Sequence, residues 1–277
     1  MQAKPTLEDA LALMRDLRAR CEWDREQTHE SLRPYLIEEA HELDDAIRRA
    51  ATEGPAQMRE ELGDVLLQVL FHSVIAEETG EFDAHDVPAS LIAKMKRRHP
   101  HLYEGGARQD WEKMKARSRG SISEGLPPNL PSLHRAHRLQ DRAAGVGFDW
   151  NDTEGPAQKV IEELEEARAL LREQAARTDT SSSPATVAVQ REIESELGDL
   201  LFAVVNLCRR AGVHPSLALD RANDKFVRRF EGVERLAAER GVVMGKASLA
   251  ELDELWEEVK REEDGERGAG SGESRHT

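Results

Sequence analysis

Two stretches in the second half of the chain decide the fold: KVIEELEEARALL at residues 159–171 and ESELGDLLFAVV at residues 194–205. Two stretches in the first half, YLIEEAHELDDAI at 35–47 and EELGDVLLQVLF at 60–71, have nearly the same pattern. Each combines aliphatic residues at intervals of three and four with acidic residues three positions apart. Aliphatic residues at this spacing predict amphipathic α-helices that pack through one apolar stripe.

The acidic pairs fall on the same flank of every predicted helix. With about 100° of rotation per residue, the first helix of the second half presents the stripe Val160, Leu164, Ala167 and Leu171. Its companion presents the stripe Ile193, Leu197, Leu200 and Val204. The acidic residues beside these stripes are Glu163, Glu166, Glu196 and Asp199. The corresponding first-half residues are Glu39, Glu42, Glu61 and Asp64. Packing through the stripes would bring four carboxylates together at one edge of each core.

Four clustered carboxylates predict a metal site. Like charges raise one another's pKa values unless a cation lies among them. Oxygen ligands without His or Cys suit a hard divalent cation such as Mg²⁺ or Mn²⁺. A single acidic pair is more often an ordinary solvated helix surface. Because the same pair occurs on four helices, in two copies, we predict metal ligands in preference to solvated faces.

Short motifs recur in the same order on either side of the Ser-, Gly- and Pro-rich segment SRGSISEGLPPNLPS. CEWD at 21–24 is echoed by GFDW at 147–150, KMKRR at 94–98 by KFVRR at 225–229, and DWEKMK at 110–115 by LWEEVK at 255–260. This order predicts a tandem duplication. We expect an N-terminal domain at 1–117, a linker at 118–132, a C-terminal domain at 133–263 and a disordered tail at 264–277.

The sequence contains no strand signals. It has no alternating run of Val, Ile, Thr or Tyr and no Asn-Gly hairpin turn, and almost every motif falls in a segment with helical periodicity. We therefore predict an all-α fold made of two tandem helical bundles, each of about four helices.

The composition excludes several classes of partner. The formal net charge of −15 argues against a nucleic-acid backbone or an anionic membrane as the main partner. The two cysteines, Cys21 and Cys208, have no metal-ligand spacing, which fits a reducing compartment. No signal peptide is recognisable, and no stretch approaches the roughly 18 uncharged apolar residues of a membrane span. We expect a cytoplasmic protein.

Three motifs follow one another in the second half: Glu-Glu-x-x-Glu, Glu-x-x-Asp and Lys-Phe-x-x-Arg. Together with WDREQTHESLRPYLIEEAHEL, RRHPHLY and GVGFDW they resemble the two-domain form of the MazG family of nucleoside triphosphate pyrophosphohydrolases. The resemblance covers nearly the whole chain except the tail. It implies two tandem MazG-like domains, a homodimer, dependence on Mg²⁺, and cleavage of nucleoside triphosphates between the α- and β-phosphates to nucleoside monophosphate and pyrophosphate.

The resemblance also implies roles for individual residues. It makes Glu163, Glu166, Glu196 and Asp199 metal ligands. It makes Lys225 and Arg229 a phosphate-contacting pair and Trp256 and Lys260 a further nucleotide-contacting pair. Lys159, which precedes the acidic motif, and Asn223 are further candidates for substrate contact. The plain structural alternatives are a basic surface patch at DKFVRR and a core position for Trp256.

The catalytic roles follow from two-metal chemistry. Metal ions bridge phosphate oxygens and lower the pKa of a bound water, while Lys and Arg side chains hold the pyrophosphate leaving group. A carboxylate near the water acts as general base, and Glu162 and Glu163 are the candidates. Glu162 lies on the far side of its helix from the stripe and Glu163 is also a candidate ligand, so both assignments stay open.

The first half lacks three polar residues of the second half. Where the second half has Lys159, Asn206 and Asn223, the first half has Tyr35, Phe71 and Ile92. The first half keeps both carboxylate pairs and Lys94, Arg98, Trp111 and Lys115. We predict a catalytic second half and a first half with a structural or regulatory role and a vestigial carboxylate set.

Two other functions stay open. One is a non-catalytic nucleotide-sensing or regulatory helical protein, which should show gaps among the ligand or phosphate residues of the second copy; none is seen. The other is a narrower enzyme for dUTP, damaged nucleotides or alarmones. Because no motif marks a base-specific pocket, the expectation is broad specificity for NTPs and dNTPs.

Overall fold

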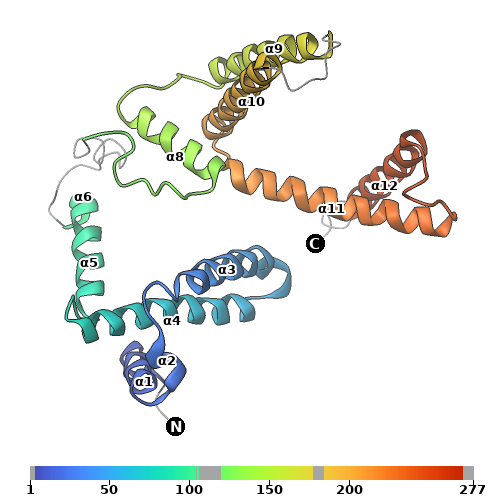
Figure 1. Cartoon of the computed structure of the whole chain (residues 1–277). Coiled ribbons are helices and arrows are strands. Elements are labelled where there is room, and N and C mark those ends of the chain that lie inside the picture. Colours follow the sequence, from blue (N-terminus) through green and yellow to red (C-terminus); the bar gives the residue numbers. More distant parts are fainter. Residues whose placement is uncertain (1–3, 104, 106–119, 177–183, 271–277) are drawn as a thin grey trace. The chain divides into compact units, whose positions relative to one another are not determined.

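The computed structural model describes residues 4–103, 105, 120–176 and 184–270, without the side chains of 184, 185 and 265–270. Every regular element in these residues is a helix, which confirms the all-α prediction (Figure 1). The chain divides into two compact units, Met1–Gln109 and Asp110–Thr277. None of the helices described is long and apolar enough to cross a bilayer.

The described residues of the first unit form four longer helices and two short ones. The longer helices are α1 (Leu7–Arg20), α3 (Arg33–Glu53), α4 (Ala56–Thr79) and α5 (Asp86–Arg98), and the short ones are α2 (Glu22–Glu26) and α6 (Pro100–Tyr103). A capping box between Thr6 and Asp9 begins α1. Gly80, with φ of 72°, ends α4 in the left-handed conformation that a side chain would disfavour.

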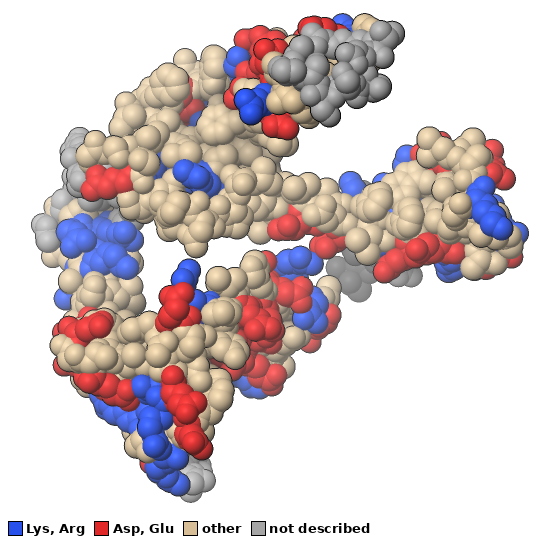
Figure 2. Space-filling model, in the orientation of Figure 1, with Lys and Arg blue, Asp and Glu red and all other residues tan. Residues whose placement is uncertain are grey.

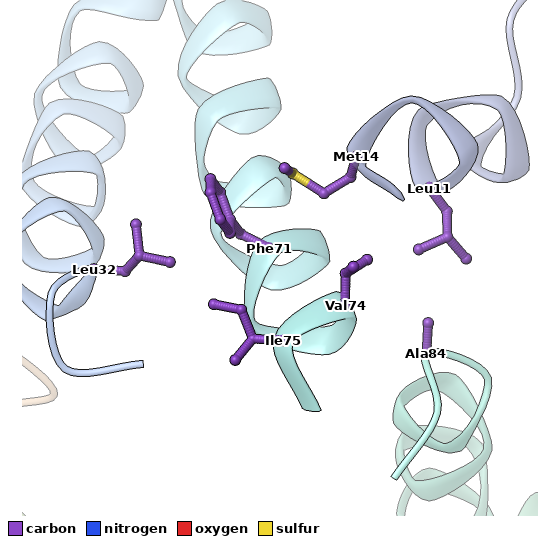
Figure 3. Packing of buried hydrophobic residues seen from close by; sticks show 7 residues of the cluster. All are labelled: Leu11, Met14, Leu32, Phe71, Val74, Ile75 and Ala84. Carbon is purple, nitrogen blue, oxygen red and sulfur yellow. The ribbon is translucent and has the colours of Figure 1, made fainter. Parts of the chain in front are cut away.

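The core of the first unit lies where α1 packs against α4. Phe71 and Val74 of α4 lie beside Met14 and Leu11 of α1, and Ile75 points to the side of Leu32 at the start of α3 (Figure 3). Ala84 before α5 completes the cluster. Phe71 is 2% exposed. This cluster is closed and apolar, and burying such side chains is the main favourable contribution to folding.

The second unit contains α8 (Ser132–Gly145), α9 (Glu154–Ala176), α10 (Pro184–Arg210), α11 (Pro215–Glu239) and α12 (Leu249–Gly270). Helices α9 and α10 pack side by side as α3 and α4 do, α8 packs against α10 and α11, and α12 packs against α11 (Figure 1). The described part of the predicted linker contacts α8, because Arg142 Nη1 donates to the carbonyls of Ile122 (2.8 Å) and Glu124 (2.9 Å).

A second apolar cluster holds α11 and α12 together. It consists of Val233, Leu236, Ala237, Leu255 and Val259, with Trp256 packed against its edge. Gly232 allows the close approach of the two helices, since a Cβ at this position would lie 2.9 Å from Cγ1 of Val259. Trp256 thus packs partly against this core, in line with the structural alternative considered for it.

The apolar stripes of α9 and α10 are only half covered within the chain. Ala167 and Ile193 are buried, but Leu164 is 41% exposed and Leu197 is 40% exposed. The contact between α9 and α10 therefore covers only part of each stripe. Each stripe is wider than one neighbouring helix can cover, as is usual for helices that face more than one partner.

An ion pair ties α1 to the end of α4 and gives the first unit a pH-dependent stability. Arg15 donates to both carboxylate oxygens of Glu77, at 2.6 and 2.9 Å, and Ala84 N donates to the same carboxylate at 3.0 Å. The hydrogen bonds from Arg15 are the main reason that the pKa of Glu77 is lowered from 4.5 to about 2. Since the folded-state pKa is lowered, the stabilisation is complete above pH 4.5 and is lost as the pH falls towards 2.

We predict that Glu77→Gln lowers the free energy of unfolding by on the order of 1 kcal/mol at pH 7, because Arg15 is partly exposed and solvent weakens the pair. Urea unfolding of wild type and variant should show this difference narrowing as the pH is lowered from 5 towards 2. Glu60→Gln, which removes an exposed carboxylate from the same helix, is the control. An equal loss at every pH would contradict the electrostatic origin.

Candidate functional site

Three carboxylates from two helices meet in the second unit. One oxygen each of Glu163 on α9 and Glu196 and Asp199 on α10 lie within 4.8 Å of one another. Glu163 is 6% exposed, Glu196 is partly buried and Asp199 is exposed. The three-residue spacing on α10 places both of its carboxylates one turn apart on the face that α9 contacts. This group of three is called the acidic site below.

The fourth carboxylate predicted for this group lies outside it. Glu166 is exposed and is not among the three that converge. Loss of hydration, followed by the charges of Glu163 and Glu196, raises the pKa of Glu166 above its ordinary value. Glu166 is therefore close enough for the charges of the acidic site to contribute to its raised pKa, but its carboxylate does not converge with the other three.

The first unit repeats the same arrangement. Glu39, Glu61 and Asp64 also have oxygens within 4.8 Å of one another, and Glu42 lies outside the group. Burial, followed by the charges of Asp64, Glu42, Glu38 and Glu61, raises the pKa of Glu39. Mutual repulsion of this kind is relieved when a cation lies between the carboxylates.

Lys159 neutralises part of the acidic site in the second unit. Its Nζ lies 2.6 Å from Glu163 Oε1 and 2.8 Å from Glu162 Oε1. These two hydrogen bonds, the one to Glu162 first, raise the pKa of Lys159 above its ordinary value. Tyr35 holds the corresponding position in the first unit, so no ammonium group faces Glu39 from there.

A cavity of about 830 Å³ opens beside the acidic site. Lys159, Glu163 and Asp199 lie on its wall, so the cavity and the acidic site are continuous. The remaining wall is mainly apolar and aromatic; it includes Ile122, Leu139, Ala143, Phe148, Trp150, Phe202 and Ala203. Its polar residues are Gln140, Asp149, Asn206 and Arg209. An apolar hollow with a few polar groups is the usual form of a small-molecule site.

Two arginines on α10 hold the aromatic loop Gly147–Trp150 in place. Asp149 accepts hydrogen bonds from both Arg209 and Arg210, and Arg210 also donates to the carbonyl of Asn151 at 2.9 Å. Arg209 is the main reason that the pKa of Asp149 is lowered. Trp150 lies over Gly155 of α9, where any Cβ would lie 2.3 Å from its ring.

The cavity has a filled counterpart in the first unit. Counting from the shared Glu-Leu-Gly-Asp motif, Phe71 and Val74 of α4 correspond to Asn206 and Arg209 of α10. Both first-unit residues are buried in the closed apolar cluster between α1 and α4. Gln140 on α8 instead donates to the carbonyl of Phe202 at 2.8 Å and contributes to an open wall.

The cationic candidates lie on the other helix pair. Arg229 pairs with Glu263 at 2.9 Å, and its guanidinium lies 5.9 Å from the centre of the Trp256 ring. Lys260 pairs with Glu257 at 2.7 Å. Asn223 and Lys225 are exposed on α11. In the described part of the second unit, the contacts of these residues stay within α11 and α12 and do not reach the acidic site.

Some functional candidates escaped the sequence analysis. The cavity wall at Gln140, Asp149 and Arg209 was not foreseen, although GFDW and the change from Phe71 to Asn206 both pointed to that region. Of the first-half counterparts, Lys94 and Arg98 lie on α5. Trp111 and Lys115 lie outside the described residues.

Comparison with known proteins identifies the family of the chain. The model of the MazG nucleotide pyrophosphohydrolase domain matches the chain twice, at residues 27–103 and 153–233. These ranges contain both groups of three carboxylates. The matches place the chain among the nucleotide pyrophosphohydrolases, a class of hydrolases. More narrowly, the chain belongs to the MazG family, which confirms the resemblance seen in its motifs.

Individual relatives extend along most of the chain. The nucleoside triphosphate pyrophosphohydrolase/pyrophosphatase MazG of Thermotoga maritima is 44% identical over 263 residues, which are 91% of this chain and 95% of the relative. The nucleoside triphosphate pyrophosphohydrolase of Escherichia coli K12 is 39% identical over 262 residues, 90% of this chain and 94% of the relative. One from Mycobacterium tuberculosis is 40% identical over 152 residues, 51% of this chain and 46% of the relative.

We predict that Gly155→Ala displaces Trp150 from the cavity wall, because the added Cβ would overlap its ring. The free energy of unfolding should fall by about 1–3 kcal/mol, as for other overpacked sites. Urea unfolding measures the loss, and near-ultraviolet circular dichroism reports the tryptophan. Gly245→Ala is the matched control, since nothing lies within 4 Å of a Cβ there. Unchanged dichroism in Gly155→Ala would contradict the contact.

Proposed function

We propose that the second unit hydrolyses nucleoside triphosphates, both NTPs and dNTPs, between the α- and β-phosphates, giving nucleoside monophosphate and pyrophosphate. One observation carries the proposal: Lys159, Glu163 and Asp199 lie on the wall of an apolar cavity of about 830 Å³. Charged groups that handle phosphates thus adjoin a hollow large enough for a nucleoside. Two relatives that match most of the chain are named nucleoside triphosphate pyrophosphohydrolases, which supports the same reaction.

Glu163, Glu196 and Asp199 hold the divalent cation in this proposal. Their oxygens converge within 4.8 Å and come only from carboxylates, which fits a hard ion such as Mg²⁺ or, as a substitute, Mn²⁺. When bound, such an ion polarises the phosphate oxygens and lowers the pKa of a water ligand. Glu166, outside the group but electrostatically linked to it, is a candidate for a contact through water.

The chain's own residues bind and orient the substrate. The nucleoside enters between the aromatic side chains of Phe148, Trp150 and Phe202, which offer flat surfaces for a base. Its phosphates then point towards Lys159 and the acidic site. Lys159 fixes the position of Glu163 through their 2.6 Å contact and adds positive charge beside the phosphates.

Glu162 is our candidate for the general base. Glu163 is committed to the acidic site, whereas Glu162 is largely exposed and touches Lys159 at 2.8 Å. A carboxylate held by an ammonium group has a defined position from which to accept a proton from an attacking water. Glu163 remains the second candidate, because of these two residues it is the one that lines the cavity.

A second copy of the chain completes the site in this proposal. Leu164 and Leu197 leave an apolar strip exposed beside the acidic site, and Phe226 and Val227 expose another on α11. Figure 2 shows uncharged surface over much of α8, with acidic side chains along the lower edge of α11. Apolar faces of this kind mark association surfaces. The α11–α12 pair of a partner would cover the apolar strip beside the acidic site. It would also bring the cationic side chains that bind the phosphates to the carboxylates.

We predict that Glu196→Gln lowers kcat/KM for every triphosphate substrate by at least on the order of 100-fold, because charge at the reacting phosphates is no longer offset. Glu61→Gln in the first unit should keep full activity. The assay separates the products formed from each common NTP and dNTP by ion exchange, with and without Mg²⁺. Glu165→Gln, which removes an exposed carboxylate of the same helix as Glu163, is the control.

The other outcomes of this assay decide between the alternatives. Release of orthophosphate and a nucleoside diphosphate would show that the enzyme does not cleave between the α- and β-phosphates. Turnover of dUTP or of modified nucleotides alone would select the narrower enzyme. Mg²⁺-dependent nucleotide binding without any turnover would select the sensor. Activity lost in Glu61→Gln but kept in Glu196→Gln would exchange the roles of the two units.

We predict that two inactive variants restore each other when mixed. Glu196→Gln keeps the cationic side chains that bind the phosphates, and Arg229→Ala keeps the carboxylates. A mixed dimer therefore has one complete site, with the carboxylates of one chain and the cations of the other. Random reassortment should give about a quarter of wild-type activity. Light scattering checks the dimer and fluorescence exchange checks the mixing. If both variants are inactive, reassort fully and stay inactive together, the carboxylates and cations of one site come from a single chain.

A further inference from the structure

Asn206 lies on the cavity wall with its amide orientation fixed by its neighbours. Arg209 donates to Asn206 Oδ1 from both Nε (3.1 Å) and Nη2 (2.9 Å). Because a guanidinium group has only donors, the atom of the amide that faces it must be the oxygen. The nitrogen Nδ2, which carries two N–H donors, therefore occupies the other end of the amide. Within the described residues, no group accepts a hydrogen bond from Nδ2.

Arg209 is itself held rigidly. Asp149 accepts from both Nη1 (3.1 Å) and Nη2 of Arg209, and Arg210 binds the same carboxylate at 3.2 Å. Asp149 thus holds Arg209, and Arg209 holds Asn206. Charge-assisted hydrogen bonds therefore fix the position of the Nδ2 donor. Such an arrangement keeps Asn206 from turning over, which would place its oxygen where its nitrogen now lies.

The position of Asn206 along α10 relates it to one part of a nucleotide. It lies seven residues beyond Asp199, which is two helical turns and about 10 Å along the same face. Asp199 belongs to the acidic site, where the phosphates are placed by the proposed function. A group about 10 Å from the phosphates, on the same wall as Phe202 and Trp150, lies at the level of the base.

We propose that Asn206 determines specificity: Nδ2 donates a hydrogen bond to a ring nitrogen or carbonyl acceptor on the nucleobase, and Arg209 and Asp149 are positioning residues for this donor. The inference rests on the proposed function, because it takes the cavity as the base site. Every standard base carries such an acceptor, so one donor accommodates many bases. Phe71 at the corresponding place in the first unit offers no donor.

The test compares ATP with its 1-deaza, 3-deaza and 7-deaza analogues, each of which lacks one ring acceptor. For wild type, one analogue should have a kcat/KM about 10-fold or more below that of ATP, as expected when a protein donor is left unpaired. In Asn206→Leu the same analogue and ATP should be hydrolysed alike. If Asn206 has a merely structural role, Asn206→Leu should lower all four kcat/KM values together and leave their ratios unchanged. That result would overturn the proposal.

A second variant tests the orientation of the amide. Asn206→Asp keeps an acceptor for Arg209 but replaces the donor by a carboxylate oxygen, so folding should be preserved while the preference for ATP over the sensitive analogue is lost. Urea unfolding checks the fold. An Asn206→Asp protein that keeps the wild-type preference would exclude Nδ2 as the donor.

Equilibrium binding separates this proposal from the proposed function. AMP and the matching deaza monophosphates are titrated into wild type and Asn206→Leu by calorimetry, which needs no turnover. If no triphosphate is hydrolysed but the monophosphates show the expected difference, the reaction is wrong and the base contact stands. If hydrolysis occurs and none of the analogues differs from ATP or AMP in wild type, the base contact is wrong and the reaction stands.

Discussion

The packing of α9 against α10 places a carboxylate in the interior of the protein, and the rest of the site depends on it. Glu163 is 6% exposed and lies one turn from the buried Ala167. A buried anion is costly unless a cation or hydrogen-bond donor faces it. Lys159 provides one positive charge from the preceding turn, and Glu196 and Asp199 add two further negative charges. The hairpin therefore combines a favourable apolar contact with an electrostatic demand that a divalent cation can meet.

The same helical hairpin has a different environment in each of the two units. Both retain three convergent carboxylates, but the neighbouring helix interface differs. In the first unit Phe71 and Val74 fill the space against α1 and contribute to a closed apolar core. In the second, Asn206 and Arg209 replace them, and the space against α8 stays hollow and partly polar. Apolar burial that would stabilise the unit is given up where a ligand has room to bind.

Periodicity was enough to predict the helices and three of the four carboxylates, because spacing along a helix fixes the side chains' shared face. It could not show that Glu166 lies outside the group, since this depends on the angle between helices and on side-chain rotamers. The cavity brings α8 and the loop at Gly147–Trp150, which follows α8 directly, together with α10, which is distant from both in sequence. The separation of Arg229 and Lys260 from the acidic site depends on how α11 leaves α10, which no periodic pattern encodes.

The side chain of Phe71 has a consequence for stoichiometry. A chain that carries the same fold twice would ordinarily be expected to bind two equivalents of its ligand, and its two carboxylate groups reinforce that impression. One aromatic ring, 2% exposed, fills the counterpart of the cavity in the first unit. The duplication thus repeats the three convergent carboxylates, whereas the α10 side chains that line the cavity in the second unit are replaced by buried apolar side chains in the first. Under the proposed function, the expected stoichiometry is therefore one nucleotide per chain and not two.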